Sequence, residues 1–304
     1  MWVKKGLLLE PQTQLWWQKS HIMLPAAAHI EGDLFRVYFS GRDEHNRSVI
    51  GYAEVKVYQG TIELQRYCDQ PVLTSGELGT FDDNGVTPSC VVTINGRKHL
   101  YYIGWNSGST TRMGLIAGLA ISDDDGNFHR YSRAPLLDRT DREPFSILTA
   151  PFVIEDNGSF RMYYVSCEGW LHRDLPIYNI KYAESTDGIN WKREGHVCID
   201  FRSPQETALA RPCVVKDADK YRMWYSYKDP AIGYRIGYAE SDDAKNWIRM
   251  DHNAGIDVSP RGWDSEMVEY SFVFDHEGYR YMLYNGNGYG TNGAGYAVFE
   301  NNRR

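Results

Sequence analysis

The chain has 304 residues, a net charge of −7 and an aromatic content of 14%. Charges of both signs are spread along it, which argues against a nucleic-acid surface, because such a surface needs a basic patch to meet phosphates. No apolar run is long enough to span a membrane, and no small-residue cleavage site follows an apolar stretch near the N-terminus.

The five cysteines are odd in number and form no Cys-x-x-Cys pair. We interpret them as reduced thiols, and with the absence of a signal peptide this predicts a cytoplasmic protein. The lone histidines lack the spacing of metal ligands, so no zinc site is predicted.

A phrase of aromatic and apolar residues recurs five times, about 60 residues apart. The copies at residues 160–165 and 221–226 are the clearest, and those at residues 35–40, 99–103 and 279–284 are fainter. A second phrase close to Gly-Tyr-Ala-Glu follows each copy. Repeats of this length with several short strands are typical of propeller blades. The residues that we take as equivalent are Tyr38, Tyr101, Tyr163, Trp224 and Met282.

In chain order, we predict a strand at residues 2–9 and then five blades of four antiparallel strands each. The fifth blade ends too early to contain an outer strand. The segment Trp2-Val3-Lys4-Lys5-Gly6 resembles the outer strand Trp191-Lys192-Arg193-Glu194-Gly195, so we expect residues 2–9 to supply the missing strand and close the ring.

The predicted fold is therefore an all-β, five-bladed β-propeller whose ring is closed by the N-terminal strand, in a single domain over residues 1–304. The blades are expected at approximately residues 20–67, 86–133, 149–196, 210–252 and 268–300 plus 2–9.

Three motifs carry a resemblance to a known superfamily. They are a Tyr-Ala-Glu-Ser strand with an Asp-Gly-x-x-Trp turn, and the phrases at residues 81–86 and 263–268. They resemble the five-bladed propeller glycosidases of glycoside hydrolase families 43, 32, 68 and 130. The resemblance implies a carbohydrate-active enzyme with its site at the central mouth, no organic cofactor, and room for a structural calcium ion in the channel.

The resemblance also implies catalytic carboxylates where the inner strands begin. Counting along the repeat, we find Pro25, Thr87, Ala150 and Ala210 at the positions where such carboxylates are expected. No familiar catalytic set therefore transfers residue by residue, and other carboxylates near the mouth have to be considered.

Cleavage of a glycosidic bond needs two carboxyl groups, one as acid and one as base or nucleophile. Inner-strand starts and second-strand ends meet at the same opening because the two strands are antiparallel neighbours. Glu269 directly precedes an inner strand, and Glu206 lies close enough in sequence to reach the same space. The predicted catalytic residues are Glu269, Glu206, Asp83, Asp43 and Glu168.

Each carboxylate also has a structural interpretation. Glu168 could pair with Arg211 or Lys228, and Asp43 could form a local salt bridge with Arg42. Asp82 and Asp264 occupy matching repeat positions, and we expect both to hold blade junctions rather than to act in catalysis.

The same rim collects residues that suit a sugar, since Trp stacks on the apolar face of the ring while Asn, Asp and Arg bind its hydroxyls. The predicted substrate-binding residues are His21, Arg42, Trp105, Asn106, Trp170, Arg211, Lys228, Asn285 and Asn287.

These observations predict a glycoside hydrolase that acts on a small or surface-type glycan with paired carboxylates. One alternative is a glycoside phosphorylase or transferase in which Arg42, Arg211 and Lys228 hold phosphate. The other is a propeller without catalysis that binds a carbohydrate or a protein.

Overall fold

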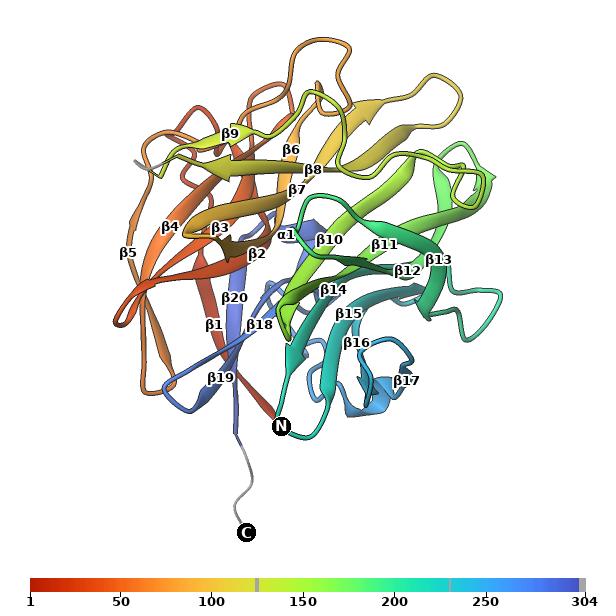
Figure 1. Cartoon of the computed structure of the whole chain (residues 1–304). Helices are drawn as coiled ribbons and strands as arrows, with labels where there is room; N and C mark the ends of the chain where they lie inside the picture. Colours follow the sequence, from red (N-terminus) through yellow and green to blue (C-terminus); the bar gives the residue numbers. More distant parts are fainter. Residues whose placement is uncertain (124–125, 230, 301–304) are drawn as a thin grey trace.

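The computed structural model describes residues 1–123, 126–229 and 231–300, and its strands fall into five groups of four (Figure 1). Residues 124 and 125 in the predicted second blade, residue 230 in the fourth, and residues 301–304 of the predicted domain lie outside this description. The all-β prediction is confirmed. No helix among the described residues is long and apolar enough to cross a membrane.

Each group is antiparallel and follows the chain in order, apart from the last, which takes its fourth strand from the N-terminus. The groups are β2 (Ser20–Glu31), β3 (Leu34–Arg42), β4 (Ser48–Tyr58) and β5 (Thr61–Tyr67); β6 (Val86–Ile94), β7 (Arg97–Ser107), β8 (Met113–Ser122) and β9 (Phe128–Arg130); β10 (Ile147–Asp156), β11 (Ser159–His172), β12 (Leu175–Ser185) and β13 (Lys192–Ile199); β14 (Ala208–Lys216), β15 (Tyr221–Asp229), β16 (Gly233–Ser241) and β17 (Ile248–Arg249); and β18 (Glu269–His276), β19 (Tyr279–Asn285), β20 (Ala294–Phe299) and β1 (Trp2–Leu9).

The inner strands follow one another around a centre. β2 contacts β6, β6 contacts β10, β10 contacts β14, β14 contacts β18, and β18 returns to β2. Short parallel pairings, β8 with β10 and β12 with β14, join three of the groups into one sheet. A 3₁₀ turn (Asp251–Asn253) and a short helix, α1 (Asn287–Gly290), complete the structure.

The N-terminal strand β1 pairs with β20, with Trp2 opposite Phe299 (Figure 1). This is the pairing predicted for residues 2–9. The indole of Trp2 is buried and packs edge-on against Phe299 and Trp224. Because the first strand completes the last blade, the two ends of the chain are held together.

A tyrosine–carboxylate–cation triplet recurs in four of the five blades. The hydroxyl of a second-strand tyrosine donates a hydrogen bond to a buried carboxylate. The same carboxylate also binds a cation from the outermost strand of the blade. In the second blade, the Tyr102 hydroxyl lies 2.9 Å from Asp82, and Arg130 Nε lies 2.8 Å from the same carboxylate. The other triplets are Tyr164–Glu143–Arg193, Tyr225–Asp251–Arg249 and Tyr284–Asp264–Lys4.

The triplets account for Asp82 and Asp264, which the sequence predicted to be structural. They also show why β1 belongs to the fifth blade, because Lys4 takes the place that Arg130, Arg193 and Arg249 take in the others. The first blade has Phe39 at the tyrosine position and so has no hydroxyl to donate.

The strand register corrects the predicted repeat by one residue in the fifth blade. Opposite the inner strands, Tyr163 faces Phe152 and Trp224 faces Cys213, whereas Leu283 rather than Met282 faces Phe272. The sequence repeat did not show this shift, because the fifth copy is faint and only the pairing of β19 with β18 fixes its alignment. Each inner strand also contains a bulge near its start. The register also shows which residues occupy equivalent positions near the starts of the five inner strands, and we call this set the ring level. It consists of Met23, Thr87, Thr149, Ala210 and Glu269.

The residue after this level adopts a left-handed backbone conformation in four blades. Its φ is 51° at Leu24, 48° at Ala150, 51° at Arg211 and 56° at Tyr270. Such angles are strained for residues other than glycine, and they persist only where the surrounding structure holds them. The bulges therefore turn side chains toward the centre of the ring at the cost of local strain.

Lys4 provides a test of ring closure. Lys4→Met should leave Asp264 buried without its cation and lower the free energy of unfolding by about 2–3 kcal/mol, less than for a fully buried pair because Lys4 is partly exposed. Lys5→Met on the same strand is the control, since Lys5 lies 3.8 Å from an exposed Glu300. Urea unfolding would measure both, and equal losses would contradict the role of β1.

Candidate functional site

A pocket of about 280 Å³ opens where the inner strands begin. All five blades contribute to its wall. Met23, Thr87, Thr149 and Ala210 come from one level of the ring, and Tyr270 comes from the fifth blade. The pocket therefore lies at the central mouth, as the sequence predicted.

Cations dominate the charge of the pocket. Arg42, Arg112, Arg211 and Lys228 line it, and exposed Asp174 is the one carboxylate among its lining residues. Burial lowers the pKa of Arg42, and the nearby charge of Arg112 lowers it further. The site is therefore electrostatically suited to an anion.

Arg211 closes the floor of the pocket. Its guanidinium donates to the backbone oxygens of Pro88 at 2.9 Å and Pro25 at 3.0 Å, so one side chain ties β14 to β6 and β2. Burial lowers the pKa of Arg211 to about 10. Its bonds to two backbone carbonyls make Arg211 a fixed part of the floor and leave Arg42, Arg112 and Lys228 nearer the opening.

Glu269 is the most unusual carboxyl group of the structure. Its side chain is fully buried, and neither oxygen has a hydrogen-bond partner among the described residues. Burial raises its pKa well above the usual range, and the positive charge of Lys228 offsets this only in part. Burial therefore favours the protonated form of Glu269, which has a proton to donate.

Three tyrosines surround this acid. The pKa of Tyr178, Tyr234 and Tyr270 is raised mainly by burial and also by the proximity of Glu269, that of Tyr178 to about 12. The hydroxyls of Tyr178 and Tyr234 lie 2.8 Å apart, and Lys228 lies 5.2 Å above the Tyr234 ring. Glu269 thus lies beside the pocket, behind residues that line it.

Two other predicted catalytic carboxylates, Glu206 and Glu168, form ion pairs away from the pocket. Both oxygens of Glu206 bind Arg249 at 2.6 Å, and one also accepts the backbone N–H of Arg202. Glu168 is 41% exposed and lies 2.7 Å from Lys181. Neither residue lines the pocket.

Asp43 and Asp83 border a separate surface hollow. Asp43 accepts two hydrogen bonds from Arg47, one from its backbone and one from its side chain, and no ion pair joins it to Arg42 in the described structure. Asp83 accepts a hydrogen bond from Asn106 at 2.9 Å. These groups hold loops together, and the geometry does not bring them to Glu269.

Of the predicted binding residues, Arg42, Trp105, Arg211 and Lys228 line the pocket, and Trp170 packs against the apolar cluster beside it. Two of the remaining four, Asn285 and Asn287, hold the backbone. Asn285 is fully buried and bonds Leu24 N–H at 2.9 Å, and Asn287 bonds the backbone of Glu266 at 2.8 Å.

Asn106 is the partner of Asp83, as described above, and His21 lies between Ser20 and Thr291. Burial, with a contribution from Arg42, lowers the pKa of His21 to about 4, so its ring is neutral at physiological pH.

Sequence reasoning missed several lining residues, among them Arg112, Asp174, Tyr178, Tyr234 and Tyr289. Arg112 and Asp174 lie on hairpins of neighbouring blades that are joined by a 3.0 Å hydrogen bond from Arg112 N–H to the Arg173 carbonyl. No repeat pattern marks hairpin ends, so only their contact in space reveals them.

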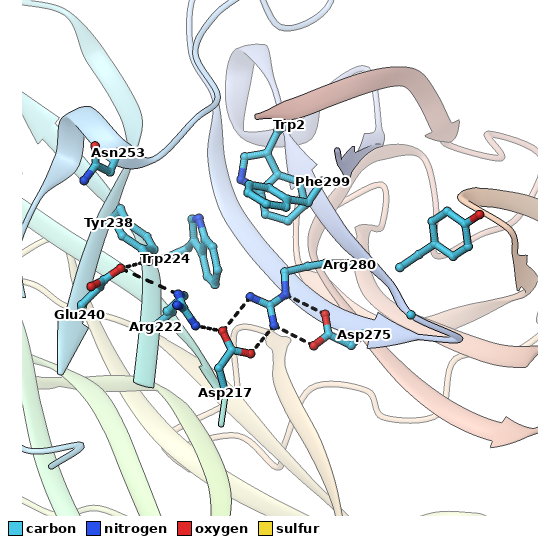
Figure 2. Close-up of a pocket in the computed structure, with 12 residues that line it drawn as sticks. Trp2, Asp217, Arg222, Trp224, Tyr238, Glu240, Asn253, Asp275, Arg280 and Phe299 are labelled. Carbon is cyan, nitrogen blue, oxygen red and sulfur yellow. Dashed lines mark hydrogen bonds and ion pairs between the residues drawn. The ribbon is translucent and has the colours of Figure 1, made fainter. Parts of the chain in front are cut away.

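A larger hollow of about 620 Å³ lies between the fourth and fifth blades, away from the mouth (Figure 2). Its charges pair with one another. Asp217 bridges Arg222 and Arg280, and Arg280 also binds Asp275. We interpret this network as a bond between adjacent blades.

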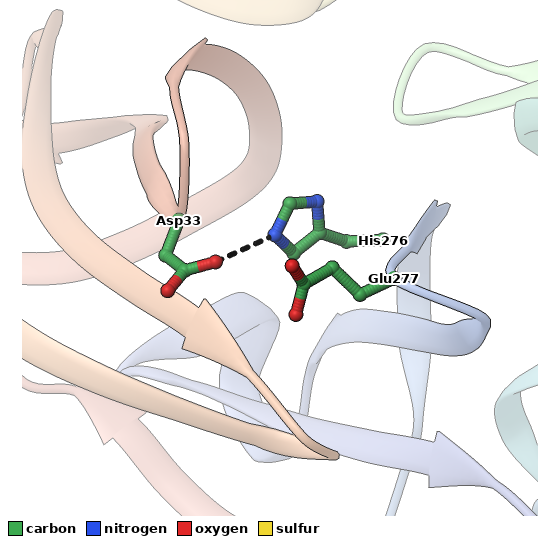
Figure 3. Close-up of side chains that lie close together, drawn as sticks. All are labelled: Asp33, His276 and Glu277. Atoms are coloured by element: carbon green, nitrogen blue, oxygen red, sulfur yellow. Dashed lines mark hydrogen bonds and ion pairs between the residues drawn. The ribbon is translucent and has the colours of Figure 1, made fainter.

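Asp33, His276 and Glu277 lie close together on turns at the far ends of the inner strands (Figure 3). Their ligand atoms lie within 4.8 Å of one another, the single such group among residues 1–123, 126–229 and 231–300. His276 Nε2 lies 3.1 Å from Asp33, and this ion pair between the fifth and first blades accounts for the contact.

The fold matches that of the five-bladed propeller glycosidases. A solved thermostable family-43 glycoside hydrolase matches 93% of this chain over 91% of its own, with a TM-score of 0.69 and 20% identity. The resemblance seen in the sequence is confirmed.

Two relatives are similar to this chain in sequence. The chain is 44% identical over 301 residues to the uncharacterized protein MT1551 of Mycobacterium tuberculosis, with 99% of each chain covered, and it belongs to the same family. It is 30% identical to a 1,2-beta-oligomannan phosphorylase of Thermoanaerobacter over 68% of this chain and 66% of that protein. No protein-family model matches the chain.

Glu269 and Glu206 should respond oppositely to substitution. Glu206→Gln breaks a buried pair and should lower the free energy of unfolding by about 3–5 kcal/mol. Glu269→Gln replaces a neutral acid with a neutral amide. Because the folded-state pKa of Glu269 is raised, its contribution to stability is present below the unfolded pKa and is lost as the pH rises through the folded value.

Glu269→Gln should therefore gain stability over the wild type between pH 5 and pH 8. Urea unfolding at both pH values measures this gain. A stability difference that does not change with pH would show that Glu269 ionises as an ordinary carboxylate in the folded protein.

Proposed function

We propose that this protein is a glycoside phosphorylase whose central pocket binds a sugar unit and inorganic phosphate. The observation that carries the proposal is the charge of the site: Arg42, Arg112, Arg211 and Lys228 line the pocket, and the buried carboxyl group of Glu269, whose pKa is raised, lies beside it. Phosphorolysis requires one acid and an anion site, because phosphate itself is the nucleophile.

The ion pairs that Glu206 and Glu168 form argue against the hydrolase that the sequence predicted. Hydrolysis needs a second carboxyl group across the scissile bond. Glu206 is bound by Arg249 and Glu168 by Lys181, so neither is free to activate water at the pocket. Asp174 is the one specific observation in favour of hydrolysis, since it lines the pocket rim.

In the proposed reaction, an oxygen of phosphate attacks the anomeric carbon while the bond from that carbon to the leaving glycosidic oxygen breaks. Glu269 is the proposed proton donor to the leaving oxygen. Because it lies behind residues that line the pocket, the transfer and the later return of a proton from solvent require those residues to shift or to relay the proton. The products are a sugar 1-phosphate and the released hydroxyl compound. The cations balance the negative charge of phosphate, and Trp105 offers its ring to the sugar.

The relative named as a 1,2-beta-oligomannan phosphorylase supports this reaction class. We further propose that residues 1–304 act as one propeller domain in the cytoplasm, where phosphate is abundant. The five cysteines are free and buried, which is consistent with a reducing compartment.

Phosphate dependence tests the proposal. Aryl glycosides and short oligosaccharides should be cleaved only with phosphate present, with release of a sugar 1-phosphate. Glu269→Gln should lower kcat about 10²–10⁴-fold because the proton donor is lost, and Arg42→Met should raise KM for phosphate about tenfold. Coupled assay of sugar 1-phosphate measures all three.

Glu63→Gln on the exposed outer strand β5 is the control and should keep full turnover. Turnover without phosphate that Asp174→Asn abolishes would establish a hydrolase instead. Sugar binding without turnover of any substrate would identify a binding propeller and overturn the enzymatic proposal.

A further inference from the structure

The wall of the central pocket is apolar below its charged rim. Apolar side chains from four blades line the cavity where a sugar ring would lie. They are Met23, Leu24, Ile103, Leu115, Ile147, Ala150, Val165, Ala208 and Ala210.

The ring level around Glu269 offers few hydrogen bonds. Ala210 has no polar side-chain atom, the Met23 sulfur already accepts a hydrogen bond from Arg42 at 3.6 Å, and the Thr87 hydroxyl already contacts Ser40 and Ser48 at 3.3 and 3.4 Å. The Thr149 hydroxyl remains, with no partner among the described residues. At this level a sugar with a hydroxyl on every carbon would find Thr149 alone, and its other partners in the pocket would be the tyrosine hydroxyls and the charged groups of the wall.

These apolar residues are not simply the edge of the blade core. Most of them belong to a hydrophobic cluster separate from the large cluster of the blades, and Trp105, Tyr178 and Tyr270 pack against it. An apolar cluster that lines a cavity can bind an apolar part of a ligand.

Resting on the function proposed above, we propose that the sugar unit in this pocket has some hydroxyls replaced or capped, as in a deoxy sugar or an O-methyl sugar. A free hydroxyl against this wall loses its bonds to water and gains none. A methyl group there gains contact with Ile147, Val165 and Ala208 instead. The cations of the rim stay available for phosphate.

The test uses aryl glycosides in several sugar series, each parent paired with its 6-deoxy and mono-O-methyl derivatives. In at least one series the derivative should have a kcat/KM about tenfold or more above that of the parent. Parents preferred in every series would overturn the inference.

Val165→Thr supplies the structural test, because it adds a hydroxyl to the wall at nearly constant volume, opposite Thr149 in the register. It should reduce the preference for the derivative at least about threefold. Val214→Thr makes the same change in the blade core and should leave the preference unchanged. Ala208→Ser serves in place of Val165→Thr should the latter not fold.

Saturation-transfer NMR with the free sugars, without phosphate, separates this inference from the proposed reaction. Preferential binding of deoxy or O-methyl sugars without turnover would retain the inference and reject the phosphorylase. Phosphate-dependent turnover with preference for the parents would do the reverse. Binding of no sugar at all would reject both.

Discussion

The recurring tyrosine–carboxylate–cation triplet is the interaction on which the rest of the structure depends. In each triplet a buried carboxylate binds a second-strand hydroxyl and a cation at the outer edge of the same blade, so the strands cannot slide past one another. In the fifth blade the cation is Lys4, which comes from the other end of the chain. The same charge pairing that stabilises single blades therefore also fastens β1 to β19 and β20.

A rigid ring makes the strained inner-strand starts tolerable. Leu24, Ala150, Arg211 and Tyr270 hold left-handed backbone angles only because strands on either side fix them. Their positions create a small pocket with a desolvated acid beside it. Burial raises the pKa of Glu269 more than the charge of Lys228 lowers it, and a flexible wall would admit water and weaken that effect.

The pocket combines two kinds of recognition at different depths. Near the opening, Arg42, Arg112 and Lys228 favour an anion, whereas the apolar wall below favours carbon. A sugar unit with few free hydroxyls, together with phosphate, satisfies both demands, and Glu269 supplies the proton that such a reaction needs. The same geometry explains why Glu206 and Asp43 were poor candidates: each is bound by arginine and serves the fold.

The sequence by itself determined the number of blades, the closing role of residues 2–9, the position of the site at the mouth, and the structural role of Asp82 and Asp264. These follow from periodicity, because similar strand and turn sequences recur along the chain and the triplet recurs in four of the five blades. Only the tertiary structure decided which carboxyl groups are free, because pairs such as Glu206 with Arg249 join residues 43 positions apart. It also decided the alignment of the faint fifth copy and the apolar wall, since only strand pairing fixes that alignment and a cavity built from five blades leaves no periodic trace in the chain.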